Sequence, residues 1–134
     1  MQNKDLAADY IKRARIRLQA VALLLQMESY ADVVREAQEC VELALKALLR
    51  KSGIQPPRIH DVSNILLEEA KHLPPELLAY VNDLARISKS MRRDRELAFY
   101  GSEDLTPSDF YVKEDAVTAL EQARFVVDTV FPHI

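Results

Sequence analysis

The sequence predicts an all-α protein: an antiparallel up-and-down bundle of four long helices plus a short helix. Apolar residues recur at three- and four-residue spacing over long segments, and no segment reads convincingly as a strand. The chain has only 2 glycines and 6 prolines among 134 residues, too few for an all-β fold dense in turns. Its length suits one domain that covers residues 1–134 and buries a single core.

The first predicted helix runs from about Asp5 to Gln26, and the second runs from about Tyr30 to Lys51. Gly53 follows the second helix and suits a left-handed cap at its C-terminal end. The second helix has a broad apolar surface, which indicates a central helix with several neighbours. Cys40 lies within that surface, so we expect it to pack rather than to react.

The rest of the chain is expected to contain a linker, two further long helices, one short helix and a loop. Prolines make the linker extended, and Asp61 or Ser63 is expected to cap the short helix that follows. A glycine ends the long fourth helix. In order, the segments are the linker Ile54–His60, the short helix to about Lys71, the long helix Pro75–Tyr100, the acidic loop Gly101–Asp109 and the final helix Lys113–Val130.

Composition limits the possible functions. The net charge of −3 means that nucleic-acid affinity would need a local basic surface. A single cysteine allows no intrachain disulfide and favours a cytoplasmic location, and no apolar stretch approaches the ~20 residues that span a bilayer. The histidines lack zinc-ligand spacing and no phosphate-binding glycine loop occurs, so we expect neither a metal nor a cofactor. The largest basic cluster at the N-terminus is either a solvated helix face or an RNA contact, and it comprises Lys12, Arg13, Arg15 and Arg17.

The candidate functional residues lie at the end of the long fourth helix. By helical spacing, Arg95 continues the buried stripe, Arg93 shares a face with Tyr100, and Arg92 can pair with Glu96. Arginine can stabilise the negative charge that develops on a phosphodiester during cleavage. We therefore assign Arg93, Arg95 and Tyr100 as candidate catalytic residues, and Arg92, Arg93, Arg95 and Glu96 as candidate ligand-binding residues. The alternative is a structural arginine that pairs with a carboxylate and pins the bundle or a dimer.

The order of these parts resembles the small prokaryotic HEPN domains over about residues 5 to 131. The resemblance rests on a glutamate–lysine helix, a proline linker, a His-Asp pair and the arginine-rich run. The first three of these segments are Glu42–Leu49, Gly53–Pro57 and His60–Val62, and Tyr30-Ala31-Asp32 precedes them. The resemblance implies a helical bundle that forms a two-fold homodimer. Many members of the family are metal-independent ribonucleases and toxins, frequently encoded beside a minimal nucleotidyltransferase that neutralises them.

The family signature is an arginine followed after four to six residues by a histidine. Here Arg95 and Arg93 have the required spacing, but both lead to Tyr100. His60 matches another family feature, for which we expect a role in capping the short helix. Two hypotheses follow: a ribonuclease or toxin component whose activity is weakened or lost, and a non-catalytic module that binds a partner protein, a nucleotide or RNA through an arginine-lined dimer cleft. A plain helical oligomer with structural arginines is the third.

Overall fold

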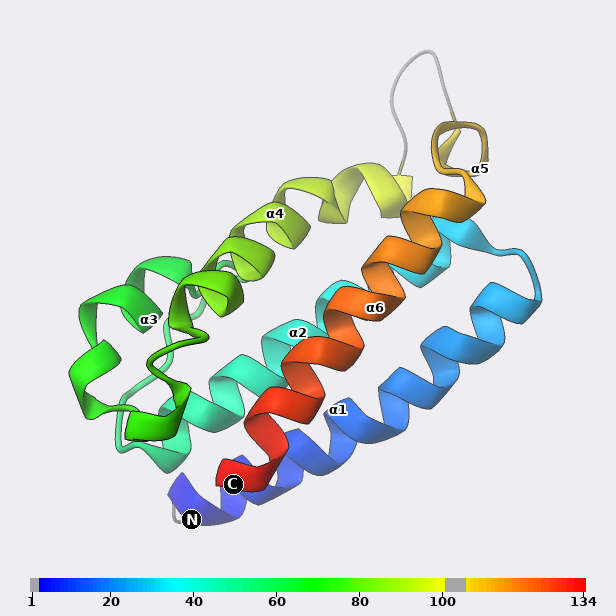
Figure 1. The fold of residues 1–134 in the computed structure, drawn as a ribbon. Helices are drawn as coiled ribbons and strands as arrows, with labels where there is room; N and C mark the ends of the chain where they lie inside the picture. The colour runs from blue at the N-terminus through cyan, green and yellow to red at the C-terminus, as the bar shows by residue number, and fades with distance from the viewer. Residues whose placement is uncertain (1–2, 101–105) are drawn as a thin grey trace.

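The protein is described from a computed structural model, which gives the backbone of residues 3–100 and 106–134 and the side chains of residues 4–92 and 106–134. This part of the chain contains helices and turns but no strand, which confirms the all-α prediction (Figure 1). The α-helices are α1 (Asn3–Gln26), α2 (Tyr30–Lys51), α3 (Ser63–Glu68), α4 (Val81–Tyr100), α5 (Pro107–Phe110) and α6 (Lys113–Val130). Short 3-10 segments cover Ala70–His72, Pro75–Leu77 and Phe131–His133.

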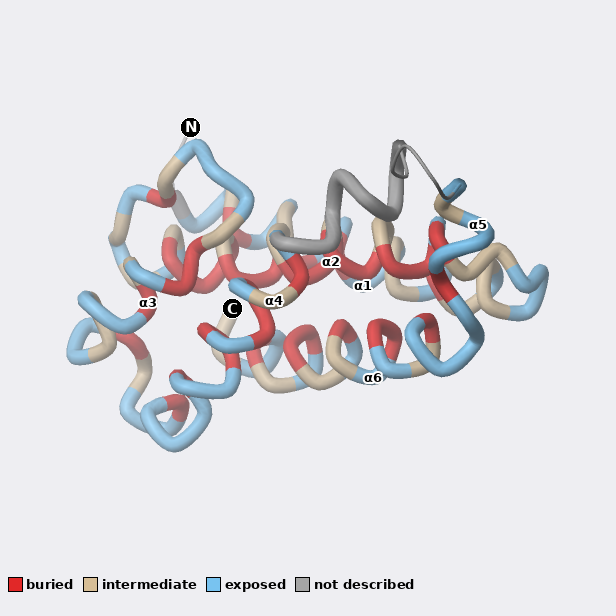
Figure 2. The backbone as a smooth tube through the Cα atoms, turned by 90° about the horizontal axis from the view of Figure 1, so that it is seen from above, coloured by how far each residue is buried: buried red, intermediate tan, exposed pale blue. Residues whose placement is uncertain are grey.

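The four long helices run alternately up and down, and α2 is the central one. It packs against α1, α6 and α4, while α1 and α4 lie on opposite sides of the bundle (Figure 1). Leu45, Leu48 and Leu49 of α2 are completely buried. Each buried leucine contributes roughly 1.5–3 kcal/mol from apolar surface removed from water. Burial follows the inward face of every long helix, as Figure 2 shows most clearly along α6.

Local sequence signals set the bounds of α2. Gly53 has a φ of +78°, in the left-handed region where a side chain is disfavoured. The N–H of Gly53 donates to the Arg50 carbonyl (3.1 Å), and the N–H of Ile54 donates to the Leu49 carbonyl (2.8 Å). These two bonds form a Schellman cap, so the prediction for Gly53 is confirmed.

The start of α4 differs from the prediction of one helix from Pro75 to Tyr100. Residues 75–77 form a 3-10 turn, residues 78–80 form a further turn, and the α-helix begins at Val81. Pro74 and Pro75 lack N–H groups, and the first turn closes with a short bond from the Leu77 N–H to the Pro74 carbonyl (2.9 Å). An apolar stripe is nevertheless buried along this segment as far as Met91, since Leu77, Val81, Leu84, Ile87 and Met91 are all buried.

Two shorter segments also depart from the predicted bounds. The short third helix ends at Glu68, and a 3-10 turn replaces its expected last residues. Within the predicted loop 101–109, residues 101–105 lie outside the described residues, but Pro107 begins the single turn of α5. That turn forms because the Thr106 hydroxyl accepts the N–H of Asp109 (3.2 Å).

Cys40 is fully buried on α2, as expected. Its Sγ lies 3.5 Å from the Ala14 carbonyl oxygen of α1 and donates to it. Burial, together with the nearby Glu36 carboxylate, raises the pKa of the Cys40 thiol to about 12. The thiol therefore packs and does not form a reactive thiolate near neutral pH.

None of the helices in the described part of the chain is long and apolar enough to cross a membrane.

Candidate functional site

The described part of the predicted site is Arg92, an exposed residue on α4. The backbone of α4 remains helical as far as Tyr100. The side chains of Arg93, Arg95, Glu96 and Tyr100 lie outside the described residues. The alignment of Arg93 with Tyr100, the pairing of Arg92 with Glu96 and the inward direction of Arg95 therefore stay predictions.

Arg92 lies at the edge of a hollow of about 650 Å³ between α4 and the linker that precedes α3. We call this hollow the α4 cleft. Its lining residues are Ile59 and Asp61 from the linker, and Arg86, Lys89, Ser90 and Arg92 from α4. The three cationic residues follow one another at three-residue intervals, which places them along one side of the helix.

The charge of the α4 cleft is positive. Arg86, Lys89 and Arg92 are exposed, and the carboxylate of Asp61 is the one acidic side chain among the residues that line the cleft. Nη2 of Arg86 also lies 3.6 Å from Oδ1 of Asp83. Both side chains are more than half exposed, so water and salt screen the attraction between their charges strongly. The arrangement suits an anion with more than one negative charge.

Two contacts from α4 hold the linker wall of this cleft. The buried Ser88 hydroxyl accepts the N–H of Val62 (3.0 Å) and lies 3.4 Å from Oδ1 of Asp61, to which it donates. The same Asp61 oxygen accepts the N–H of Ser63 (2.9 Å) at the start of α3. The predicted N-cap, Asp61 or Ser63, is therefore wrong, because Val62 occupies that position. Asp61 lies one residue before it and accepts the N–H of the first helical residue.

His60 does not cap the short helix, contrary to the expectation for the His-Asp pair. Its Nδ1 lies 2.6 Å from Oε1 of Glu42 on α2, whereas its neighbours Ile59 and Asp61 line the α4 cleft. Glu42 also accepts hydrogen bonds from Lys46 (3.1 Å) and Gln38 (3.2 Å).

The environment of Glu42 favours its charged form. Burial by itself raises the pKa of Glu42, but the hydrogen bonds from His60, Lys46 and Gln38 outweigh that effect. The pKa of Glu42 is therefore lowered below its ordinary value. A charged Glu42 fixes the linker to α2, while Ser88 fixes it to α4.

The basic cluster on α1 is largely occupied by contacts within the chain. Arg17 pairs with Glu36 of α2 (2.9 Å), and Arg13 lies 3.8 Å from Asp9. The guanidinium of Arg15 lies over the Phe131 ring, 4.0 Å from its centroid. These contacts favour the interpretation of the cluster as a helix face over an RNA contact.

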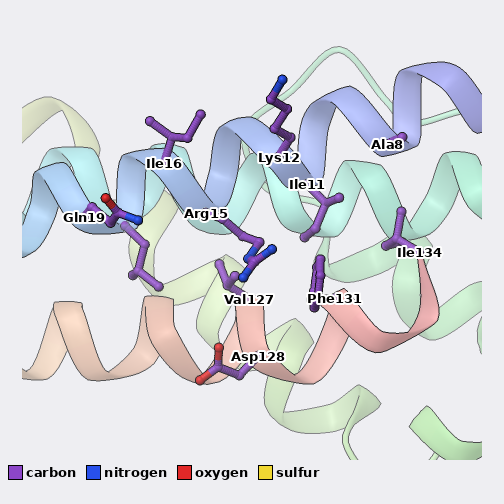
Figure 3. Close-up of a pocket in the computed structure, with 11 residues that line it drawn as sticks. Ala8, Ile11, Lys12, Arg15, Ile16, Gln19, Val127, Asp128, Phe131 and Ile134 are labelled. Carbon is purple, nitrogen blue, oxygen red and sulfur yellow. The ribbon is translucent and has the colours of Figure 1, made fainter.

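A second hollow, of about 690 Å³, lies between α1 and α6 (Figure 3). Ile11, Val127, Phe131 and Ile134 provide much of its surface, and Arg15 points into it across Phe131. We call it the α1–α6 groove. Lys12, Arg15 and Asp128 also line it, so the groove mixes apolar and charged side chains.

The sequence interpretation found Arg92 but missed Arg86, Lys89 and the linker residues. The three-residue spacing of Arg86, Lys89 and Arg92 was a signal available in the sequence. The position of Ile59 and Asp61 beside these cations could not be predicted from the sequence, because it depends on how the linker crosses α4. In the part of the chain that the structure describes, no three histidine, cysteine, aspartate or glutamate side chains gather to hold a metal ion.

Comparison with known proteins supports the resemblance. The chain is 31% identical over 127 residues to the protein named "Putative toxin MJ1304" of Methanocaldococcus jannaschii, in a match that covers 90% of this chain and 83% of the other. Its fold is similar to the crystal structure of TT1696 from Thermus thermophilus, with a TM-score of 0.77 and 23% identity over 96% of this chain and 98% of that one. The HEPN domain family matches residues 7–132, and the chain therefore belongs to the HEPN domain family.

Proposed function

We propose that this HEPN protein is the toxin-type component of a toxin–antitoxin pair and that it binds RNA through the α4 cleft. The observation that carries the proposal is the row Arg86, Lys89 and Arg92 on one side of α4, next to the arginine-rich end of the same helix. Exposed cations in a row match the phosphates of an RNA backbone and require no particular base sequence.

The toxin role is supported by the relative from Methanocaldococcus jannaschii, whose name contains the words "putative toxin". From the family resemblance we further propose a minimal nucleotidyltransferase as the antitoxin and a homodimer as the functional form. A cytoplasmic location, expected from the single cysteine, stays a prediction.

RNA binding has more support than RNA cleavage. Metal-independent cleavage ordinarily uses a group that titrates near neutral pH, and histidine is the side chain that does so. His60 is the histidine nearest in sequence to the residues that line the α4 cleft, but its ring contacts Glu42 on α2. Tyr100 stands where the family signature has its histidine. A tyrosine with its ordinary pKa of about 10 is a poor acid or base at pH 7.

Cleavage remains the second candidate function, because Arg93, Arg95 and Tyr100 keep the spacing of the signature. In this case the arginines would stabilise the charge on the phosphodiester and Tyr100 would orient it.

One set of measurements tests both candidates. Purified wild-type protein, Arg95→Ala and Tyr100→Phe are incubated with labelled single-stranded RNA, and both binding and cleavage are followed. We expect binding without cleavage for the wild type. Cleavage that is lost in either variant would establish the nuclease function instead, and failure of the wild type to bind RNA at low salt would contradict the proposal.

The toxin role needs a cellular test. Expression of the wild-type chain alone should arrest growth, and co-expression of a nucleotidyltransferase from a neighbouring gene should restore it. Growth that is unaffected by the chain alone would contradict the toxin role without bearing on RNA binding.

A further inference from the structure

The two walls of the α4 cleft differ in chemistry. The helix wall carries Arg86, Lys89 and Arg92. Arg92 lies six positions after Arg86, so this row of cations runs for about 9 Å along α4. The linker wall carries Ile59 and Asp61. Phosphates suit the cations, but they give no role to an isoleucine or to a carboxylate. The linker wall is therefore suited to a different part of the ligand.

Ile59 offers an apolar surface next to these cations. It is 59% exposed and it lines the cleft. An exposed isoleucine is ordinary by itself. Beside a row of phosphate-binding cations, however, it is placed so that the flat face of a nucleobase can pack on it. In a duplex, stacking and pairing cover the bases, so only an unpaired base can make this contact.

Asp61 has one carboxylate oxygen that is held in place and one that is available. Oδ1 accepts the N–H of Ser63 (2.9 Å) and the hydroxyl of Ser88 (3.4 Å). These two bonds orient the carboxylate against the start of α3 and against α4. Among the described residues, no hydrogen bond goes to Oδ2, and none of the cleft cations forms an ion pair with Asp61. Oδ2 can therefore accept a hydrogen bond from a ligand.

The four bases of RNA differ in what they offer to a carboxylate. Cytosine, adenine and guanine each carry an exocyclic amino group, which donates hydrogen bonds. Uracil has a carbonyl oxygen where cytosine has its amino group, and its N3–H lies between two carbonyl oxygens. A carboxylate oxygen accepts hydrogen bonds and cannot donate one, so it repels those carbonyl oxygens.

We propose that Asp61 selects an unpaired base that carries an amino group and so discriminates against uracil. This inference rests on the proposed RNA function of the α4 cleft. The cations of α4 hold the phosphates, Ile59 packs on the face of the base, and Oδ2 of Asp61 accepts the amino N–H. The cleft, of about 650 Å³, lies within the range of about 300–1,000 Å³ found for small-ligand pockets, so one nucleotide has room in it. Phosphate contacts supply the affinity, and the linker wall supplies the selectivity.

The first test compares labelled oligo(C) and oligo(U) strands of equal length by fluorescence anisotropy at one salt concentration. Both bases are pyrimidines, and they differ at the 4-position of the ring. We expect the wild type to bind oligo(C) about fivefold more tightly, the effect of one hydrogen bond to a partly exposed charged acceptor. A strand with 2-pyrimidinone in place of cytosine has hydrogen instead of the amino group, and it should lose this advantage.

The second test changes the acceptor. Asp61→Asn keeps an oxygen for the Ser63 N–H and replaces Oδ2 by an NH₂ group, which donates. The preference for oligo(C) should therefore vanish or reverse. The matched control is Asp128→Asn, which makes the same change in charge at an exposed position on α6 and should keep the fivefold ratio. Circular dichroism should show the same helix content for both variants, and the 2-pyrimidinone strand tests the proposal on the wild type should Asp61→Asn fail to fold.

The third test removes the apolar surface. Ile59→Ala should weaken the binding of both strands by about threefold, because the base loses its packing contact. Ile16→Ala, at a residue of similar exposure (58%) on α1, should leave binding unchanged. Equal effects of these two variants would overturn the packing role of Ile59.

The outcomes separate the base selection from RNA binding itself. Equal affinity of the wild type for oligo(C) and oligo(U), or an unchanged ratio in Asp61→Asn, would overturn the base selection alone. Failure of the wild type to bind either strand would contradict the proposed RNA function and the base selection together.

Discussion

Helices α1 and α4 lie on opposite sides of the bundle (Figure 1), yet their outward faces have different chemistry. Both bury an apolar stripe inward, and both are exposed outward. The outward face of α1 carries Ile16, Leu23 and Met27 after its basic first half, whereas exposed cations, Arg86 and Lys89, lie on α4. An apolar stripe is suited to a protein surface, and a row of cations is suited to a polyanion. Under the proposed function, RNA would contact the α4 side of the bundle and leave the outward face of α1 uncovered.

The largest expected effect concerns the three cations that line the α4 cleft. Replacing Arg86, Lys89 and Arg92 together by alanine should lower the affinity for single-stranded RNA by about a hundredfold at 0.1 M salt, because three phosphate contacts are lost. The slope of the logarithm of the RNA-binding constant against the logarithm of the salt concentration should become shallower by about 2. Fluorescence anisotropy at several salt concentrations measures both quantities.

The control for this experiment has the same change in net charge at other places. It replaces the exposed cations Lys51, Lys71 and Arg124 by alanine. Equal losses of affinity in the two triple variants would mean that overall charge, and not the α4 cleft, governs the binding.

The second expected effect separates the two faces of α1. Val21 is completely buried, so Val21→Ala should lower the free energy of unfolding by about 2 kcal/mol at any protein concentration. Leu23→Ala should cost less than about 0.5 kcal/mol in the dilute protein, since Leu23 is 56% exposed.

Thermal unfolding of the two variants beside the wild type measures both costs. A cost of Leu23→Ala as large as that of Val21→Ala would contradict the assignment of Leu23 to the outward face of α1.

The smallest expected effect concerns the linker that forms one wall of the α4 cleft. The lowered pKa of Glu42 means that its charged form stabilises the folded state. This contribution is complete above the unfolded pKa of about 4.3 and is lost as the pH falls through the folded value. Glu42→Gln should therefore cost about 1 kcal/mol at pH 7. The difference from the wild type should shrink as the pH falls below about 4.3 and should disappear only below the lowered pKa of folded Glu42.

Urea unfolding at a series of pH values provides the measurement. Glu68→Gln, at an exposed position on α3, serves as the control and should follow the wild type throughout. If the free energy of unfolding of Glu42→Gln also equals that of the wild type at every pH, the contact between Glu42 and His60 does not hold the linker.

Much of the fold was predictable because its signals are local. The bounds of α2 and α6 agree with the sequence prediction to the residue, since apolar periodicity and the cap at Gly53 define them. The start of α4 was not predictable to the same extent. The sequence Leu73-Pro74-Pro75 is compatible with the start of an α-helix. A 3-10 turn formed there instead, closed by hydrogen bonds between residues three positions apart.

The sequence by itself determined the helical bundle, its buried stripes and the cationic character of α4, because each depends on residues within a few positions of one another. Only the tertiary structure decided that Ile59 and Asp61 line the cleft beside Arg92, and that His60 turns to Glu42. Those contacts join residues that lie 18 or more positions apart in the chain. They depend on how the linker crosses between α2 and α4, and no periodicity or local propensity encodes such a crossing.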